Sequence, residues 1–262
     1  MSGAEPAALR VLAGAVARRA GALLLERFGT PARGVEAKSS RTDLVSDADR
    51  DAEELIVSAL RAARPGDGLL GEEGAGSRGT SGLRWVIDPL DGTTNFLWGI
   101  PQWAVSIAVE DQDGPLAGVV FDPCRGELFG AARGDGADLD GAVLRLGDGP
   151  PLAEALIATG FNYDRGERER QAGRMPGVIP AVRDIRRMGA AALDLAWVAA
   201  GRVDGYFETG LQPWDRAAGA LIVAEAGGVV RELPASPGGV GPCTLAAPAS
   251  LAEALEDLVR GG

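Results

Sequence analysis

The sequence has no histidine. This absence excludes Ser-His-Asp and Cys-His catalysis, phosphohistidine intermediates and histidine-ligated zinc. The only cysteines, Cys124 and Cys243, lie far apart and outside any CxxC or CxxH pattern, so neither a disulfide framework nor a zinc site is indicated, and a reducing cytoplasm is the expected location. Any hydrolytic chemistry must therefore use carboxylates and hydroxyls, most naturally around a hard cation with oxygen ligands.

Long hydrophobic runs and an excess of positive charge are also missing. Arg10, Arg18 and Arg19 interrupt the apolar residues near the N-terminus, which leaves neither a secretory hydrophobic region nor a membrane span. The 37 acidic and 26 basic residues give a net charge of -11, which repels nucleic acids and anionic membranes, so we expect neither as a partner. A small phosphorylated substrate is also an anion, and a bound divalent cation would locally reverse the repulsion.

The first half of the chain has the pattern of an α+β fold. Helical periodicity predicts helices over about 9–29 and 46–63, and alternation at 103–110 predicts an antiparallel sheet with one buried face. The other expected strands are 68–71, 83–87, 116–121 and 127–131, with an extended piece around Val35.

The second half alternates strands and helices, which is typical of an α/β fold. A segment rich in Gly, Asp and Pro at 134–151 is the expected internal boundary, giving halves 1–148 and 149–262 that form one catalytic unit. The expected strands are 155–159, 184–188, 205–208 and 229–232, and the expected helices are 167–179, 190–201 and those that begin at 213 and 249.

The stretch WVIDPLDGTTNF at 85–96 places two carboxylates three residues apart at the end of a strand. Pro89 restricts one φ angle and Gly92 permits a left-handed backbone, so Asp88 and Asp91 could converge on a cation. N–H groups from Gly92 to Thr94 would favour an anion beside it if a helix begins there. Taken alone, however, Asp-Gly is more often a simple turn, and Asp88 could be a strand-end cap.

Five other acidic residues are open to the same two interpretations. Glu72 and Glu73 follow a strand and could form a solvated loop; because strand neighbours point to opposite faces, at most one would reach the same site. Ser46 and Asp49 fit a capping box. Asp215 follows Pro213 at a helix start, where an acid is favoured in any protein, and Glu208 ends a strand. The chain has no P-loop and no dinucleotide-binding fingerprint.

Read in order, four blocks resemble the inositol monophosphatase family: 43–49 (DLVSDAD), 71–73 (GEE), 85–96 and 214–219 (WDRAAG). Shorter similarities at 160–161, 189–192, 201–208 and 224–228 extend the resemblance over nearly the whole chain. The resemblance implies a layered α/β/α/β/α sandwich of the inositol monophosphatase and fructose-1,6-bisphosphatase type. It also implies a Mg²⁺-dependent, lithium-sensitive phosphatase that is commonly homodimeric.

The resemblance further implies a role for each matching residue. Two Mg²⁺ ions would be bound, with a third and weaker ion held with the help of Asp49. Thr93, together with Glu72 or Asp49, would position the attacking water. The N–H groups of Gly92 and Thr93 would hold the phosphate, and Asp91, Ala191 and Glu208 would line the polyol pocket. The ligands of the first two ions would be Glu72, Asp88, Asp91, Asp215 and the carbonyl of Leu90.

The implied reaction is attack of a metal-activated water on inositol monophosphate or a similar small polyol phosphate. Three other esters fit the same chemistry: histidinol phosphate, fructose 1,6-bisphosphate and a 3′-phosphoadenosine nucleotide. A protein that binds a phosphorylated metabolite or a macromolecular partner without turnover is the alternative from another class. Four positions depart from the family pattern: Ser46 replaces threonine, Trp98 a common histidine, Asp140 an asparagine and Ala190 a hydroxyl residue, so the substrate surface is expected to differ.

Overall fold

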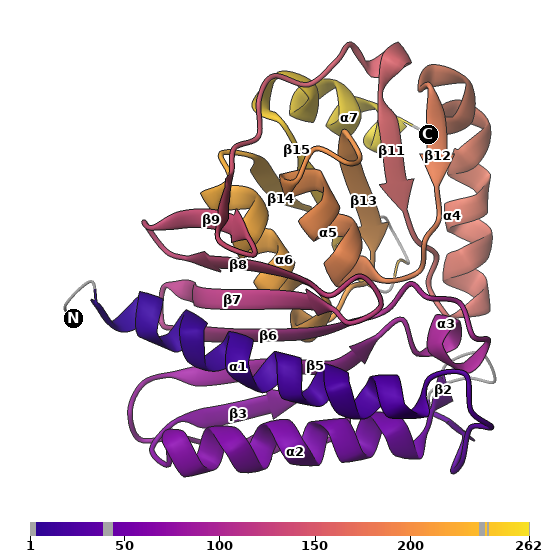
Figure 1. Cartoon of the computed structure of the whole chain (residues 1–262). Helices are drawn as coiled ribbons and strands as arrows, with labels where there is room; N and C mark the ends of the chain where they lie inside the picture. The colour runs from indigo at the N-terminus through magenta and orange to yellow at the C-terminus, as the bar shows by residue number, and fades with distance from the viewer. Residues whose placement is uncertain (1–3, 39–43, 236–238, 240, 262) are drawn as a thin grey trace.

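The computed structural model describes residues 4–38, 44–235, 239 and 241–261. The chain forms five layers (Figure 1), which confirms the predicted α/β/α/β/α sandwich. Two long helices cover one face of an eight-stranded sheet, a second pair lies between the two sheets, and a third pair covers the outer face of a five-stranded sheet. In that order the helices are α1 (Ala4–Arg27) and α2 (Asp47–Ala63), α5 (Ala191–Ala199) and α6 (Pro213–Glu225), and α4 (Arg165–Val178) and α7 (Ala249–Gly261).

The eight-stranded sheet has the order β10-β9-β8-β7-β6-β5-β3-β4. It is antiparallel, as predicted, except that β3 runs parallel to β5. Its strands are β3 (Gly68–Gly71), β4 (Gly76–Ser77), β5 (Arg84–Asp91), β6 (Ala104–Asp111), β7 (Gly114–Asp122), β8 (Glu127–Ala132), β9 (Gly136–Leu139) and β10 (Ala142–Leu144).

The prediction that only one face of this sheet is buried was wrong. Val105 and Ile107 pack into the core shared with α1 and α2, whereas Ala104 and Ala108 face the core shared with α5 and α6. Where α6 crosses β6 and β7, this second face carries small residues such as Ala108 and Gly118, so the helix can approach closely: a Cβ at Gly118 would lie 2.9 Å from Cα of Ala218. A small-residue face looks weakly apolar in the sequence although it is fully covered.

The five-stranded sheet has the order β12-β11-β13-β15-β14, with β11 parallel to β12 and β13 and the other pairs antiparallel. Its strands are β11 (Leu156–Thr159), β12 (Asp184–Arg186), β13 (Gly205–Thr209), β14 (Val229–Leu233) and β15 (Cys243–Ala247), of which β15 was not predicted. The remaining elements are the small antiparallel pair β1 (Glu36–Ala37) and β2 (Leu44–Val45), the short helix α3 (Thr93–Leu97), and the 3-10 turns η1 (Leu152–Glu154) and η2 (Ile179–Ala181).

The segment 134–151 is not a plain linker, because it contains β9 and β10. The change from one sheet to the other falls after β10 and before β11. The division into halves at 148 and 149 stays a prediction. In the described part of the chain, no helix combines the length and apolar character needed to cross a membrane.

Candidate functional site

The two aspartates of the 85–96 stretch both lie in β5, which continues to Asp91 instead of ending in a turn. In a regular strand, side chains three residues apart point to opposite faces. Here Asp88 pairs with Ser106 and Asp91 with Ala104, so β5 advances three residues while β6 advances two. This bulge places one extra residue in β5 and restores both carboxylates to one side. The predicted convergence is thus achieved by an irregular strand, with Asp88 Oδ1 accepting from Leu90 N–H at 3.0 Å.

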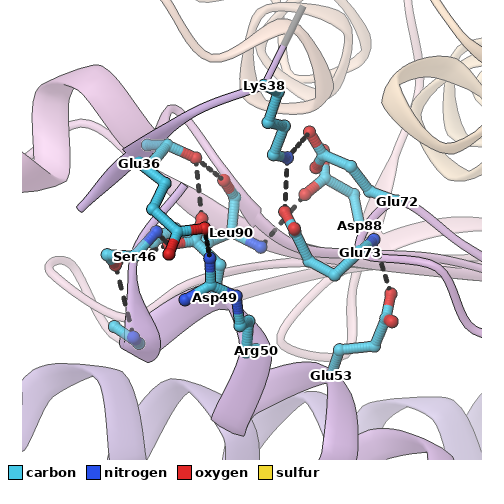
Figure 2. Close-up of polar contacts among 12 residues, drawn as sticks. Glu36, Lys38, Ser46, Asp49, Arg50, Glu53, Glu72, Glu73, Asp88 and Leu90 are labelled. Carbon is cyan, nitrogen blue, oxygen red and sulfur yellow. Dashed lines mark hydrogen bonds and ion pairs between the residues drawn. The ribbon is translucent and has the colours of Figure 1, made fainter. Parts of the chain in front are cut away.

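Glu72 reaches the same region because β3 lies parallel to β5 and both strands end at one edge of the sheet. Its N–H donates to Ile87 O at 3.1 Å. The following loop is held by Glu53 of α2, which accepts hydrogen bonds from the N–H groups of Glu73 and Ala75 at 2.9 Å. Figure 2 shows the ammonium of Lys38 between Glu72 and Glu73; it donates to Glu72 Oε1 at 2.8 Å and also to Glu73. Of the two glutamates, only Glu72 is among the residues that line the adjoining cavity.

Asp49 is oriented by the predicted capping box at the start of α2. Its Oδ2 accepts from Ser46 N–H at 2.8 Å and from Ser46 Oγ at 2.6 Å (Figure 2). Its Oδ1 lies 2.9 Å from the hydroxyl of Thr93, which also lies 3.0 Å from Leu90 O. Since a hydroxyl has one proton, Thr93 donates to one of these two acceptors at a time. The structure therefore brings Asp49, Leu90 and Thr93 into direct contact.

Gly92 joins β5 to α3 with φ of 91°, in the left-handed region that favours glycine. The position is also crowded: a Cβ there would lie 3.0 Å from Gln102 O and 3.2 Å from Gly189 O. Conformation and space both require glycine, which fixes how the chain turns from Asp91 toward Thr93.

Asp91 also connects the eight-stranded sheet to the helix layer between the sheets. Its Oδ1 and Oδ2 accept from the N–H groups of Ala191 (3.1 Å) and Ala192 (2.7 Å) at the start of α5. The N-cap residue itself, Ala190, offers no side-chain hydrogen bond, so Asp91 satisfies these helix donors from another part of the fold. The contact places Ala191 beside Asp91.

Asp215 and Glu208 come from the C-terminal half. Asp215 is the third residue of α6 and accepts from Gln212 N–H at 2.7 Å, which confirms its position at a helix start. Glu208 lies near the end of β13 and accepts a hydrogen bond from the hydroxyl of Tyr206 at 2.7 Å.

These elements surround a cavity of about 450 Å³ between the two halves of the chain. Six of the predicted site residues line it, whereas Asp49, Asp88, Leu90 and Thr93 lie behind its wall and are almost fully buried. The six that line it are Glu72, Asp91, Gly92, Ala191, Glu208 and Asp215. All ten predicted residues thus lie in or directly behind one site, although their individual roles stay predictions.

Burial and mutual repulsion disfavour the charged forms of these acids. Burial raises the pKa of Asp88 well above its ordinary value, and the carboxylates of Glu72, Asp91 and Asp215 add to the rise. Burial also raises the pKa of Asp91 to about 7, against the opposing hydrogen bond from Ala192. The pKa of Asp215 is raised well above its ordinary value for the same reason, against the hydrogen bond from Gln212 N–H.

The acids at the margins of the cluster behave similarly. Burial raises the pKa of Asp49, and hydrogen bonds from Ser46 and Thr93 oppose the rise. Burial raises the pKa of Glu73 to about 7 in spite of Lys38. Although burial lowers the pKa of Lys38, the neighbouring glutamates raise it above its ordinary value. A cation among these groups would stabilise their ionised forms.

The donor set suits Mg²⁺, because it consists of carboxylate and carbonyl oxygens. Within the described residues, no three acidic or cysteine side chains are gathered closely enough to hold one ion together. Mg²⁺ does not need such a group, since it keeps several waters and is usually held by one or two carboxylates. The residues therefore fit Mg²⁺ in their chemistry and in their location at one cavity.

Reasoning from sequence missed several residues of this site, Lys38 and Glu53 among them. Lys38 is the only lysine in the chain, and that singularity was a usable signal. Arg187, from the loop before α5, also lines the cavity; burial raises the pKa of Glu208, and the positive charge of Arg187 is one of the influences that oppose the rise. Neither Glu53 nor Arg187 belongs to a recognisable local pattern.

Comparison with known proteins decides the family. A model of the inositol monophosphatase family matches residues 6–260. The chain belongs to this family. It is 44% identical over 269 residues to the inositol-1-monophosphatase SuhB of Mycobacterium tuberculosis, covering 96% of this chain and 93% of that protein.

Two further proteins extend the comparison. Nus factor SuhB of Escherichia coli is 44% identical over 218 residues, which is 82% of each chain. The crystal structure of extragenic suppressor protein SuhB from Bartonella henselae superposes with a TM-score of 0.89 at 40% identity, over 97% of this chain and 99% of that one. Membership of the inositol monophosphatase family supports phosphatase chemistry at the family level.

The departures from the family pattern lie mostly outside the cavity wall. Trp98 was expected to change the wall of the pocket, but it is 66% exposed and is not among the residues that line the cavity. Ala190 is buried behind the neighbouring Gly189 and Ala191, which do line the cavity. Asp140 has φ of 49° in the turn between β9 and β10. Asp43, the first residue of the 43–49 block, lies outside the described residues.

Proposed function

We propose that this protein is a Mg²⁺-dependent phosphomonoesterase that hydrolyses inositol monophosphate or a similar small polyol phosphate. One observation carries the proposal: three carboxylates from separate segments, Glu72, Asp91 and Asp215, line one cavity, and a fourth, Asp88, is buried directly behind its wall. Burial raises the pKa of Asp88, and the nearby carboxylates of Glu72, Asp91 and Asp215 add to the rise. Lys38 and Arg187 are the only basic side chains that line the cavity in the described part of the chain. Such a site favours a divalent cation and, through it, a phosphate.

Glu72, Asp88, Asp91, Asp215 and the carbonyl of Leu90 would hold two Mg²⁺ ions, and Asp49 would help to hold a third. When bound, these ions would supply an activated water and stabilise negative charge on the phosphate and the leaving oxygen. This allocation is supported by the oxygen donors and by their position at the ends of β3, β5 and the start of α6.

The remaining roles fall to groups of the chain itself. The Thr93 hydroxyl, in contact with Asp49, would orient the attacking water, with Glu72 as the alternative partner. The N–H groups of Gly92 and Thr93 would donate to the phosphate. Asp91, Ala191 and Glu208 would contact the polyol. Glu208 suits hydroxyl recognition because a carboxylate accepts hydrogen bonds from donors in several directions.

The deciding experiment is a comparison of kcat/KM for phosphate release at millimolar Mg²⁺. The panel contains inositol 1-phosphate, histidinol phosphate, fructose 1,6-bisphosphate and 3′-phosphoadenosine 5′-phosphate. We expect the inositol ester to be the best substrate, and the nucleotide the poorest because the chain has a net charge of -11. A higher kcat/KM for any of the other three would assign the same chemistry to a different substrate.

A second candidate function is binding of a phosphorylated metabolite or a macromolecular partner without turnover. It is favoured by the similarity to a protein named as a Nus factor. Retention of the full acidic set and of Thr93 supports catalysis instead. Absence of phosphate release across the whole panel would support the binding function.

A homodimer is the oligomeric state that we propose. Trp98 and Ile100 support it, because these two large apolar side chains are 66% and 48% exposed within three residues. Light scattering during size-exclusion chromatography tests the proposal. A monomeric mass at micromolar concentration would contradict it.

A further inference from the structure

Tyr206 is fully buried, yet its hydroxyl is hydrogen-bonded to a residue that lines the cavity. Residues 206 and 208 of β13 share one face of the strand, since side chains alternate. The Tyr206 hydroxyl donates to Oε2 of Glu208 at 2.7 Å. Glu208 itself lines the cavity. The phenol therefore contacts the carboxylate from its protein side, away from the space open to a ligand.

A second constraint acts on the same carboxylate from the neighbouring strand. β11 runs parallel to β13 with Thr159 beside Phe207, so Gly160 follows directly at the level of Glu208. A Cβ at position 160 would overlap the Glu208 carboxyl group, Cδ and both oxygens included. The φ of Gly160 is not in the left-handed region, so space alone requires glycine. The carboxylate is thus held by a hydrogen bond and by close backbone contact.

We infer that Tyr206, with the space left by Gly160, is a positioning residue that fixes the Glu208 carboxylate for recognition of substrate hydroxyls. Because Glu208 is a proposed substrate residue, this role rests on the proposed function. The Tyr206 proton occupies one acceptor position on Oε2, and the remaining acceptor positions of the carboxylate stay available to hydroxyl donors. A fixed acceptor distinguishes one arrangement of hydroxyls from another, whereas a mobile one adapts to several.

The ligand class that follows is a phosphate ester whose leaving group carries hydroxyls, as opposed to an aryl or alkyl ester. Only hydroxyl-bearing esters would use Glu208. Tyr206 should therefore affect their binding and have little effect on an ester such as p-nitrophenyl phosphate. A residue that only stabilised the fold would affect both classes alike.

The first test measures kcat and KM for inositol 1-phosphate and p-nitrophenyl phosphate in the Tyr206→Phe variant. We expect KM for the inositol ester to rise about tenfold, as for the loss of one hydrogen bond, with kcat/KM for the aryl ester within about twofold of wild type. Gly160→Ala should have the same selective effect, because it displaces the carboxylate from the other side. Equal loss with both esters, or no loss with either, would overturn the role.

Thr159→Val is the matched control. Thr159 is buried in β11, and its hydroxyl donates at 2.8 Å to the backbone oxygen of Phe207 in β13, the strand that carries Tyr206 and Glu208. Like Tyr206→Phe, the variant therefore removes a buried hydroxyl that donates to a residue of β13. The acceptor of this hydrogen bond is Phe207 O, not the Glu208 carboxylate. We expect it to lower thermal stability without changing the ratio of KM values. A change of that ratio equal to that of Tyr206→Phe would contradict a specific role for Tyr206.

The second test does not depend on turnover. The sequence has two tyrosines, so Tyr163→Phe leaves Tyr206 as the only one. In that background the ¹³Cζ resonance of labelled tyrosine should shift when Glu208 is changed to Gln; an unchanged resonance would disprove the hydrogen bond.

If the wild type hydrolysed no ester, the proposed function would fail. The Kd for inositol 1-phosphate would then decide the role of Tyr206, with about tenfold weakening in Tyr206→Phe supporting it and an unchanged Kd overturning it.

Discussion

Oδ2 of Asp91 accepts a hydrogen bond of 2.7 Å from the N–H of Ala192, 101 residues further along the chain. The same carboxylate lines the cavity between the two halves of the chain. Asp91 therefore has a structural part, as the cap of α5, and a proposed part in metal binding.

These two parts can be separated with Asp91→Asn. The amide keeps one oxygen acceptor but loses the charge, so we expect phosphate release to fall below detection while the free energy of unfolding falls by only about 1 kcal/mol. Phosphate release and urea unfolding measure the two effects. Asp113→Asn, at an exposed aspartate in the turn after β6, is the control and should change neither. Full activity of Asp91→Asn would exclude this site.

Removal of metal should abolish activity. Excess chelator removes Mg²⁺, and the carboxylates alone cannot offset the charge of a phosphate. By family resemblance, Li⁺ should inhibit. Phosphate release before and after addition of chelator, with recovery on readdition of Mg²⁺, checks the first expectation. Activity that persists in excess chelator would contradict the proposed chemistry.

The affinity for Mg²⁺ should depend on pH. Burial raises the pKa of Asp91 to about 7, and a metal ligand must be deprotonated. The Mg²⁺ concentration needed for half-maximal activity should therefore fall as pH rises from 6 to 8, by roughly tenfold per unit below pH 7 if one proton is released. Titrations of Mg²⁺ at fixed substrate saturation test this. A flat profile would show that no ligand loses a proton over this range.

Lys38 should report on the occupancy of the site. Its ammonium donates to Glu72, so a cation bound by Glu72 would weaken this contact and lower the pKa of the amine. We expect Mg²⁺ to increase the rate of acetylation of Lys38 at pH 9. Because the chain has one lysine, mass spectrometry can follow it directly, with the N-terminal amine as internal control. Equal rates with and without Mg²⁺ would argue against binding at Glu72.

Asp194 of α5 should make stability depend on pH. Asp194 is 1% exposed, and neither of its carboxyl oxygens has a hydrogen-bond partner among the described residues. Burial raises its pKa well above the ordinary value, with Glu208 and Asp91 adding to the rise. The folded protein then holds a proton that the unfolded chain releases above about pH 4, so this group lowers stability as pH rises.

Asp194→Asn should remove that dependence. We expect the variant to exceed the wild type in unfolding free energy by about 1–3 kcal/mol at pH 8, and by less at pH 5. Urea unfolding at both values measures the difference. The exposed Asp184→Asn serves as control. Destabilisation of equal size at both pH values would show that the carboxylate is stabilised by a partner.

Most of the secondary structure was predictable because it depends on local patterns. The capping box of Ser46 and Asp49 begins α2, and Pro213 begins α6, as predicted. β15 was missed because its sequence, CTLAA, has only one strongly apolar side chain beyond alanine and cysteine; it forms because β13 and β14 lie on either side of it. Pairing between distant strands leaves no such local signal.

The sequence by itself determined the family and the exclusion of histidine chemistry, and it predicted most of the acidic residues in or beside the cavity, because residue identity and order carry that information. Only the tertiary structure decided that a bulge turns Asp88 and Asp91 to one side, and that Lys38 lies between Glu72 and Glu73. It alone placed the Tyr206 hydroxyl on Glu208 against Gly160. The physical reason is that a hydrogen bond or a close contact depends on register and distance between segments, which no short stretch of sequence specifies.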